Sequence, residues 1–171
     1  MSIFSLSKPK KMHDILDFHF QNDPDSVSVS FNSVNYSNKI IYNKVNSLIS
    51  KLKNSGLVPG DRVAVLSKNN VAFIELLYAA SKMGLVLVPI NFRLAYPEIN
   101  FILGDSGSKI LFYEEEFEEV VRQLIKDKFS LNGSIKIGID GQYEGFNENK
   151  ISTIAYNFNE SENIPLFQMY T

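Results

Sequence analysis

Hydrophobic and polar positions follow a strand–helix–strand pattern in the middle of the chain. A continuous apolar run at residues 63–66 follows a Pro59-Gly60-Asp61 turn, and a second run occupies residues 85–90. Runs without polar alternation are typical of strands buried on both faces of a parallel sheet. Between them, apolar residues recur at helical spacing up to Gly84, and Asn69 or Asn70 can cap this helix. The pattern predicts one parallel crossover unit.

Similar hydrophobic patterns before and after this crossover unit predict an α/β fold for the whole chain. Residues 27–31 alternate apolar and polar, and Asn32-Ser33 leads into residues 34–36, which predicts a β-hairpin near the N-terminus. Helical spacing predicts four more helices, at residues 10–20, 38–54 (capped by Ser37), 96–103 and 114–128. Apolar runs predict further strands at residues 109–113, 135–139 and 166–170. The fold class is therefore a mostly parallel sheet flanked by helices, with a small hairpin.

The segment from residue 140 to 162 breaks this pattern. It is polar and rich in Asn, Gly and Glu, so we predict a loop or an irregular covering segment, to which residues 151–158 could add a short strand.

The amino-acid composition of the chain excludes several classes of function. The chain has 171 residues, of which 44% are hydrophobic and 21% charged, as is usual for a soluble globular domain. A net charge of −2 argues against nucleic acid as a partner, because such surfaces normally carry a basic excess. With no cysteine there is no disulfide framework and no thiolate metal site. No apolar run suits a secretory signal or a transmembrane segment, so we expect a cytoplasmic protein.

The first predicted helix carries two features that could bear chemistry. Lys8, Lys10 and Lys11 lie at its start, and we interpret them as a solvated helix end, because a membrane anchor normally needs a richer basic face. His13 and His19 are six residues apart and do not share a helix face. Without a further histidine or cysteine at ligand spacing, we predict no metal site here.

Carboxylates are concentrated at residues 114–119, which include five glutamates. Such a cluster could hold a metal or act as a general acid. Acidic residues are also favoured in the first turn of a helix, where they complement the helix dipole. Basic residues toward the other end of the predicted helix complete that pattern, so we assign the cluster a structural role.

Several short motifs occur together and in order along the chain. They are Gly60-Asp61-Arg62-Val63, Asn69, Met83-Gly84, Val88-Pro89-Ile90-Asn91-x-Arg93-Leu94, Asp105-Ser106-x-x-Lys109 and Tyr170-Thr171. This series resembles the amino-terminal region of acyl-adenylate-forming enzymes (the AMP-dependent synthetase and ligase superfamily), and is most similar to the fatty-acid and acyl-CoA synthetase branch. A looser likeness to the family's Leu-Thr-Tyr-x-Glu-Leu motif ends at Tyr36.

The resemblance implies a place for residues 1–171 within a larger enzyme. They would form the N-terminal subdomain of its large domain and end just before the phosphate-binding loop, which in the family reads Tyr-Thr-Ser-Gly-Thr-Thr-Gly-x-Pro-Lys-Gly. Thr171 would be the first residue of that incomplete loop and the one ATP-binding candidate. No nucleophile–base pair or metal cluster is recognisable in the sequence, so no catalytic residue is predicted, and the isolated chain is expected to be inactive.

The resemblance also implies substrates and cofactors for the parent enzyme. It would use ATP, Mg²⁺ and coenzyme A to convert a carboxylic acid, expected to be a fatty acid, into an acyl-AMP and then a CoA thioester. The fragment itself is expected to bind none of these tightly, and to self-associate through apolar surface left uncovered. Arg93 follows a predicted parallel strand, where ligand sites lie, but we assign it the role of tying the next helix to the core.

Three alternatives remain open. Within the family, a peptide-synthetase adenylation domain is the nearest, although that branch usually has Asp-Pro where this chain has Asn91-Phe92-Arg93. A non-catalytic interaction module could use the same scaffold to bind a partner subunit. A complete flavodoxin-like or Rossmann-like nucleotide-binding domain would need a glycine-rich turn after a strand, and no G-x-G-x-x-G follows any predicted strand.

Overall fold

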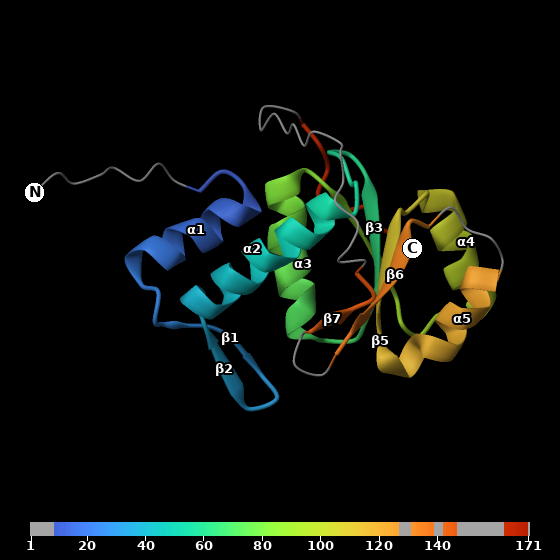
Figure 1. Cartoon of the computed structure of the whole chain (residues 1–171), viewed down its shortest axis with the longest axis horizontal. Helices are drawn as coiled ribbons and strands as arrows, with labels where there is room; N and C mark the ends of the chain where they lie inside the picture. Colours follow the sequence, from blue (N-terminus) through green and yellow to red (C-terminus); the bar gives the residue numbers. More distant parts are fainter. Residues whose placement is uncertain (1–8, 127–130, 139–141, 147–162, 171) are drawn as a thin grey trace, which may run out of the picture.

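The computed structural model describes residues 9–126, 131–138, 142–146 and 163–170, and shows three layers with a sheet between two groups of helices (Figure 1). The elements in chain order are α1 (Met12–Asn22), β1 (Val27–Phe31), β2 (Val34–Ser37), α2 (Asn38–Asn54), β3 (Arg62–Leu66), α3 (Val71–Met83), β4 (Val86–Ile90), α4 (Tyr96–Ser106), β5 (Ile110–Glu114), the 3₁₀ turn η1 (Glu115–Phe117), α5 (Glu118–Lys126), β6 (Gly133–Ile137) and β7 (Tyr143–Glu144).

The main sheet has the strand order β4-β3-β5-β6-β7. The first four strands are parallel, and β7 is antiparallel to β6. In the centre, Val63 of β3 pairs with Leu87 of β4 on one side and with Ile110 of β5 on the other. The predicted mostly parallel sheet is confirmed. None of the helices that the structure describes is long and apolar enough to cross a membrane.

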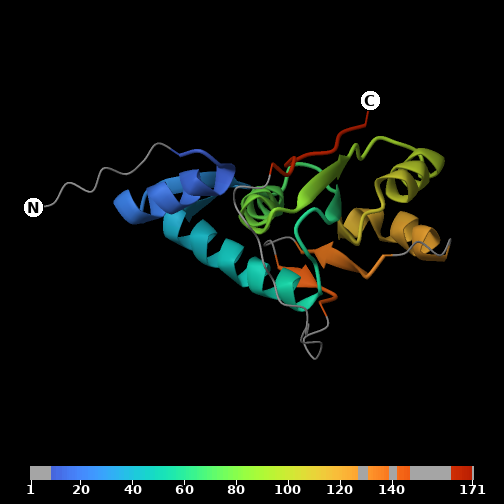
Figure 2. The same cartoon turned by 90° about the horizontal axis from the view of Figure 1, so that it is seen from above.

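Each face of the sheet is covered by its own hydrophobic core. Helices α2 and α3 lie on one face, with α1 packed against these two helices, and α4 and α5 cover the other face, as the view from above also shows (Figure 2). Alternate residues of β3 point into different cores, Val63 and Val65 into the first and Ala64 and Leu66 into the second. This two-sided burial explains why the parallel strands are continuous apolar runs.

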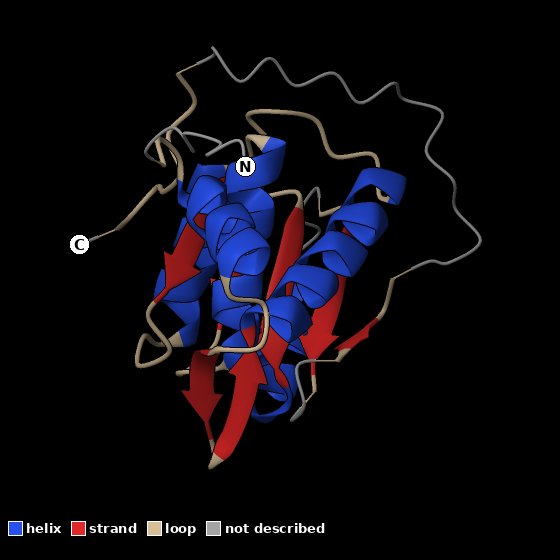
Figure 3. Ribbon diagram, turned by 90° about the vertical axis from the view of Figure 1, so that its left-hand side faces the viewer, coloured by secondary structure: helices blue, strands red, loops and turns tan. Residues whose placement is uncertain are grey.

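The hairpin of β1 and β2 forms a separate two-stranded sheet that projects from one end of the molecule (Figure 3). Its turn residues Asn32 and Ser33 have φ values of 49° and 62°, as a two-residue type I′ turn requires. Ser37 then caps α2 by accepting the N–H of Ile40 at 3.3 Å. The predicted hairpin and cap are confirmed.

The crossover unit also forms as predicted, and the structure identifies the cap of its helix. The Asn70 side chain accepts the N–H of Ala72 at 3.0 Å. The helix ends at Gly84, whose φ of 63° lies in the left-handed region that glycine adopts without a steric cost.

Four sequence predictions differ from the structure. Helix α4 does not end at Gly104 but continues to Ser106, with the left-handed Gly107 as its C-cap, so a glycine inside the helix is tolerated. The helix predicted from residue 114 begins with the 3₁₀ turn η1. In the segment predicted to be irregular, β7 adds a strand to the sheet. Residues 151–158 lie outside the described residues.

The fourth difference is the strand predicted at residues 166–170. Only Phe167 forms a bridge, parallel to Leu87 of β4, through two backbone hydrogen bonds of 2.8 and 2.9 Å made by the Leu87 N–H and C=O. The segment 163–170 therefore lies beside β4 and continues the parallel arrangement, but it makes too few ladder bonds to form a regular strand.

A buried carboxylate connects the helical layer to the edge strand β7. Glu75 of α3 is 0% exposed. One of its oxygens lies 2.9 Å from Lys44 Nζ of α2, and the other accepts the hydroxyl of Tyr143 at 2.8 Å. Pairing with a cation and a donor offsets the cost of burying this charge. Burial, together with the negative charge and the hydrogen bond of Glu75, raises the pKa of Tyr143 well above 10.

We predict that Tyr143→Phe lowers the unfolding free energy by about 2 kcal/mol at pH 7, because a hydrogen bond to a charged group is lost. The folded protein keeps the Tyr143 proton at pH values where an unfolded tyrosine loses it. This contribution is therefore complete below pH 10 and is lost as the pH rises above 10. Urea unfolding from pH 8 to 11 checks this: the gap between wild type and variant narrows above pH 10. A gap that stays constant contradicts it.

Candidate functional site

The carboxyl ends of the parallel strands meet at one edge of the sheet, where ligand sites of open α/β sheets lie. Strands β3, β4 and β5 end there at Leu66, Ile90 and Glu114. Strand β3 lies between the other two, and the helices that follow β3 and β5 cover opposite faces of the sheet. The loops after these two strands therefore diverge, and a crevice is expected between them.

A carboxylate of the chain itself occupies this crevice. Glu114 at the end of β5 accepts the Ser67 hydroxyl and, at 2.8 Å, the backbone N–H of Lys68, both from the loop after β3. The Lys68 ammonium pairs with Glu116 at 2.6 Å. These bonds join the two diverging loops across the carboxyl edge of the sheet.

Two cavities lie near this edge of the sheet. One, of about 350 Å³, lies between the hairpin and the loop after β3, and is lined by Val29, Ser30, Phe31, Ser67, Lys68, Asn69, Asn70, Val71, Phe73, Ile74 and Phe92. The other, of about 470 Å³, is an apolar groove along the first turns of α4, and is lined by Asn91, Leu94, Pro97, Glu98, Phe101, Ile102 and Tyr170.

Large apolar side chains are exposed on α4 and on the segment 163–170. Phe101 is 63% exposed, Met169 72% and Phe167 37%. The rings of Phe101 and Tyr170, which both line the second groove, meet edge to face at 6.4 Å between centroids. Exposed apolar side chains of this size are typical of a surface that another polypeptide covers.

A chain of polar contacts holds the segment 163–170 at the sheet. Arg62 Nε donates to the side-chain oxygen of Gln168 at 2.8 Å, and the amide nitrogen of Gln168 donates to the Tyr170 hydroxyl at 2.7 Å. The Tyr170 hydroxyl donates in turn to Asp105 of α4 at 2.6 Å. Desolvation and the bond to the Asp105 carboxylate raise the pKa of Tyr170. These contacts hold Tyr170, the residue directly before Thr171, against α4 and β3.

Thr171, the predicted first residue of the phosphate-binding loop, lies outside the described residues. Its neighbour Tyr170 is described, and sequence reasoning missed the partner Asp105, which is distant in the chain. The Asp105-Ser106 and Gly60-Asp61-Arg62 motifs supply two of the residues in this contact chain.

Arg93 does not have the role expected of it. Its exposed guanidinium carbon lies 5.5 Å from the centroid of the Phe92 ring, and its backbone N–H donates to the Asn91 side chain at 3.0 Å. The start of α4 is instead capped by Glu98, whose carboxylate accepts the N–H of Ala95 at 2.8 Å. The side chain of Arg93 therefore packs on a neighbouring ring at the surface and does not tie α4 to the core.

The acidic cluster has the predicted structural role. Glu115 and Glu116 lie in η1, and Glu118 in the first turn of α5 pairs with Arg122 at 2.8 Å. In the part of the chain that the structure describes, no three His, Cys, Asp or Glu side chains gather to hold a metal ion.

Comparison with known proteins identifies the class to which this fold belongs. Residues 16–171 match the family described as AMP-binding enzyme, which covers most of the chain. The chain belongs to this family. It is 40% identical over 107 residues to ScoC, a fatty acid–[acyl-carrier-protein] ligase of Streptomyces coeruleorubidus, a match that covers 63% of this chain and 21% of that protein.

A second relative and a solved structure are consistent with membership of this family. The chain is 48% identical over 79 residues to FadD13, a long-chain-fatty-acid–CoA ligase of Mycobacterium tuberculosis, a match covering 44% of this chain and 16% of that protein. It superimposes on the crystal structure of the N-terminal domain of FACL13 from the same organism with a TM-score of 0.74 and 30% identity, covering 95% of this chain and 42% of that one. The chain thus spans about a fifth or less of the length of these curated relatives.

We predict that Tyr170→Phe loosens the segment 163–170, because both hydrogen bonds of the hydroxyl are lost while the ring remains. Each bond is worth about 1 kcal/mol, which corresponds to a roughly fivefold larger open population, so exchange is at least about fivefold faster. Hydrogen exchange of the Leu87 and Gln168 amides, which make the bridge to β4, measures this. Tyr36→Phe in the hairpin serves as the control. Exchange rates equal to those of the control would show that the contact chain does not hold the segment.

Proposed function

We propose that residues 1–171 form the N-terminal subdomain of the large domain of an ATP-dependent acyl-CoA synthetase. The observation that carries this proposal is the family match over residues 16–171, together with relatives named as fatty acid ligases. The site that this part of the chain supports is the carboxyl edge of the sheet, beside the apolar groove along α4. We place the parent enzyme in the cytoplasm.

The proposed reaction has two steps. In the first, a carboxylate oxygen of the fatty acid attacks the α-phosphorus of ATP, and pyrophosphate leaves, which gives an acyl-AMP. In the second, the thiol of coenzyme A attacks the acyl carbonyl carbon, loses its proton, and AMP leaves. Phosphoryl groups of this kind are stabilised by backbone N–H groups, hydroxyls and cations.

The role of this chain is to position the phosphate-binding loop. Tyr170 is fixed against α4 through Asp105 and against β3 through Gln168 and Arg62. Thr171 follows directly and supplies the first hydroxyl of the loop. We expect the isolated chain to be inactive and to bind ATP, Mg²⁺ and coenzyme A weakly, because Thr171 is the one residue of the phosphate-binding loop that it contains.

The alternatives differ from this proposal in the acyl acceptor or in the acid that the enzyme activates. The likeness to ScoC makes an acyl-carrier protein a second candidate acceptor in place of coenzyme A. The chain also shares 28% identity over 152 residues with surfactin synthase subunit 2 of Bacillus subtilis, so an amino acid is a second candidate acid. A non-catalytic interaction module would activate no acid.

Carboxylate-dependent ATP–pyrophosphate exchange tests the proposal on the full-length protein that contains this chain. We predict exchange with long-chain fatty acids, no exchange with amino acids, and thioester formation when coenzyme A is added. The 171-residue chain alone, assayed as the control, gives none. Exchange that depends on amino acids, or a full-length protein without exchange for any acid, contradicts the assignment.

We also propose that the isolated chain self-associates through the exposed patch of Phe101, Phe167 and Met169, because association would bury this apolar surface and the open side of the segment beside β4. Sedimentation velocity at increasing concentration is predicted to show a dimer that Phe101→Ser/Met169→Ser abolishes. Val34→Ser removes an equally apolar, half-exposed side chain from the hairpin and leaves the dimer intact. A monomer at all concentrations would rule out this patch as an interface.

A further inference from the structure

The cavity of about 350 Å³ beside the hairpin has the size and the lining of a small-molecule site. Its apolar lining comes from β1, from the start of α3 and from the loop after β4, and consists of Val29, Phe31, Val71, Phe73, Ile74 and Phe92. A cavity of about 150 Å³ is enough to hold benzene, so the present volume suits an aromatic ring with a substituent. The phenylalanine rings favour such a ligand, because aromatic pairs gain from stacked and edge-to-face contacts.

A largely buried amide also lines this cavity. Asn70 is 9% exposed, and its side-chain oxygen accepts the N–H of Ala72 at 3.0 Å. This cap of α3 determines which end of the amide is the nitrogen. Among the residues that the structure describes, no acceptor lies within hydrogen-bond distance of Asn70 Nδ2. Both hydrogens of this nitrogen are therefore available to a ligand.

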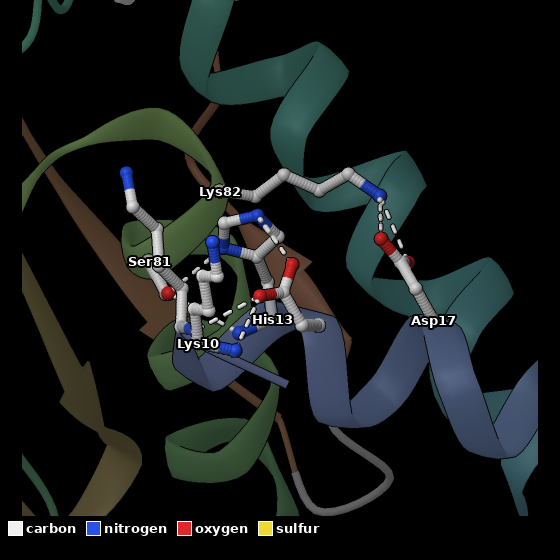
Figure 4. Close-up of polar contacts among 7 residues, drawn as sticks. Lys10, His13, Asp17, Ser81 and Lys82 are labelled. Atoms are coloured by element: carbon white, nitrogen blue, oxygen red, sulfur yellow. Dashed lines mark hydrogen bonds and ion pairs between the residues drawn. The ribbon is translucent and has the colours of Figure 1, made fainter. Parts of the chain in front are cut away.

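Polar side chains farther along α3 do have protein partners, across its contact with α1. Ser81 Oγ lies 2.9 Å from His13 Nδ1 (Figure 4). Lys82 Nζ lies 3.0 Å from a carboxylate oxygen of Asp17, as the same view shows. Buried polar groups are normally paired in this way. The nitrogen of Asn70 lacks such a partner within the described residues, and a carbonyl oxygen of a ligand would supply it.

The charged groups beside the cavity disfavour an anionic ligand. Lys68, which lines the cavity, pairs with Glu116 at 2.6 Å. Glu114 accepts the backbone N–H of Lys68 at 2.8 Å, so two carboxylates lie beside this one ammonium group. One positive and two negative charges leave an excess of negative charge, which would repel a further anion.

We propose that this cavity binds an uncharged aromatic compound that carries a carbonyl oxygen. The oxygen accepts a hydrogen bond from Asn70 Nδ2, and the rings of Phe31, Phe73 and Phe92 contact the aromatic part. The cavity borders the first hydrophobic core, whereas the groove along α4 borders the second. This site is therefore separate from that groove and does not depend on the proposed synthetase activity.

Titration of the 171-residue chain with acetophenone, followed by the NMR shifts of its backbone amides, tests the proposal. Ethylbenzene has a similar shape without the acceptor, and benzoate carries a charge in place of the ketone. We predict saturable binding of acetophenone that is at least about fivefold tighter than binding of either analogue, because one hydrogen bond contributes roughly this factor.

Asn70→Asp separates the hydrogen bond from the shape of the cavity. This variant keeps an oxygen that can cap α3 but replaces the donor nitrogen with an acceptor. We predict that it weakens acetophenone binding by at least about fivefold and changes ethylbenzene binding by less than about twofold. Equal weakening of the two ligands would show that Asn70 does not donate to the carbonyl, and would overturn the proposal.

Phe73→Leu tests the location of the site. Because one aromatic wall is lost, we predict that both acetophenone and ethylbenzene bind about threefold to tenfold more weakly. The matched control is Phe101→Leu, which makes the same change in the groove along α4 and leaves binding within about twofold of wild type. Absence of saturable acetophenone binding, tighter binding of benzoate, or weakening by the control variant alone would each overturn the proposal.

Discussion

Strand β3 is buried on both faces, and the position of every other element depends on this burial. Val63 and Val65 pack under α2 and α3, while Ala64 and Leu66 pack under α4 and α5. A strand in this position can be paired only by other apolar strands, and can be connected to them only by helices that cross a face of the sheet. The three-layer arrangement and the parallel order β4-β3-β5-β6 both follow from that requirement.

The same arrangement brings the carboxyl ends of β3, β4 and β5 together at one edge of the sheet. At the carboxyl ends, the diverging loops are joined by Glu114, and the surface beside them along α4 is apolar and exposed. This exposed apolar surface is suited to contact with further polypeptide.

The elements that sequence alone predicted are those specified by local patterns. The apolar run of β3, the Asn70 cap, the turn at Asn32 and the left-handed Gly84 each depend on a few neighbouring residues. The apolar stripe expected on α3 omitted Glu75, which is fully buried, because its partners Lys44 and Tyr143 are distant in the chain. The bond from Tyr170 to Asp105 was missed for the same reason. Strand β7 lies close to its partner β6 in the sequence, but with two residues it is too short to show a pattern. Long-range polar pairing has no periodicity from which to predict it.

We propose that these residues lead directly into the phosphate-binding loop of an adenylating enzyme. Sequencing the source gene beyond the codon for Thr171 is the most direct test. We predict an in-frame Ser-Gly-Thr-Thr-Gly followed shortly by Pro-Lys-Gly, because backbone N–H groups, hydroxyls and a lysine are what the phosphates of ATP require. A stop codon there, or a continuation without glycines and lysine, would contradict the claim and favour a non-catalytic protein on the same scaffold.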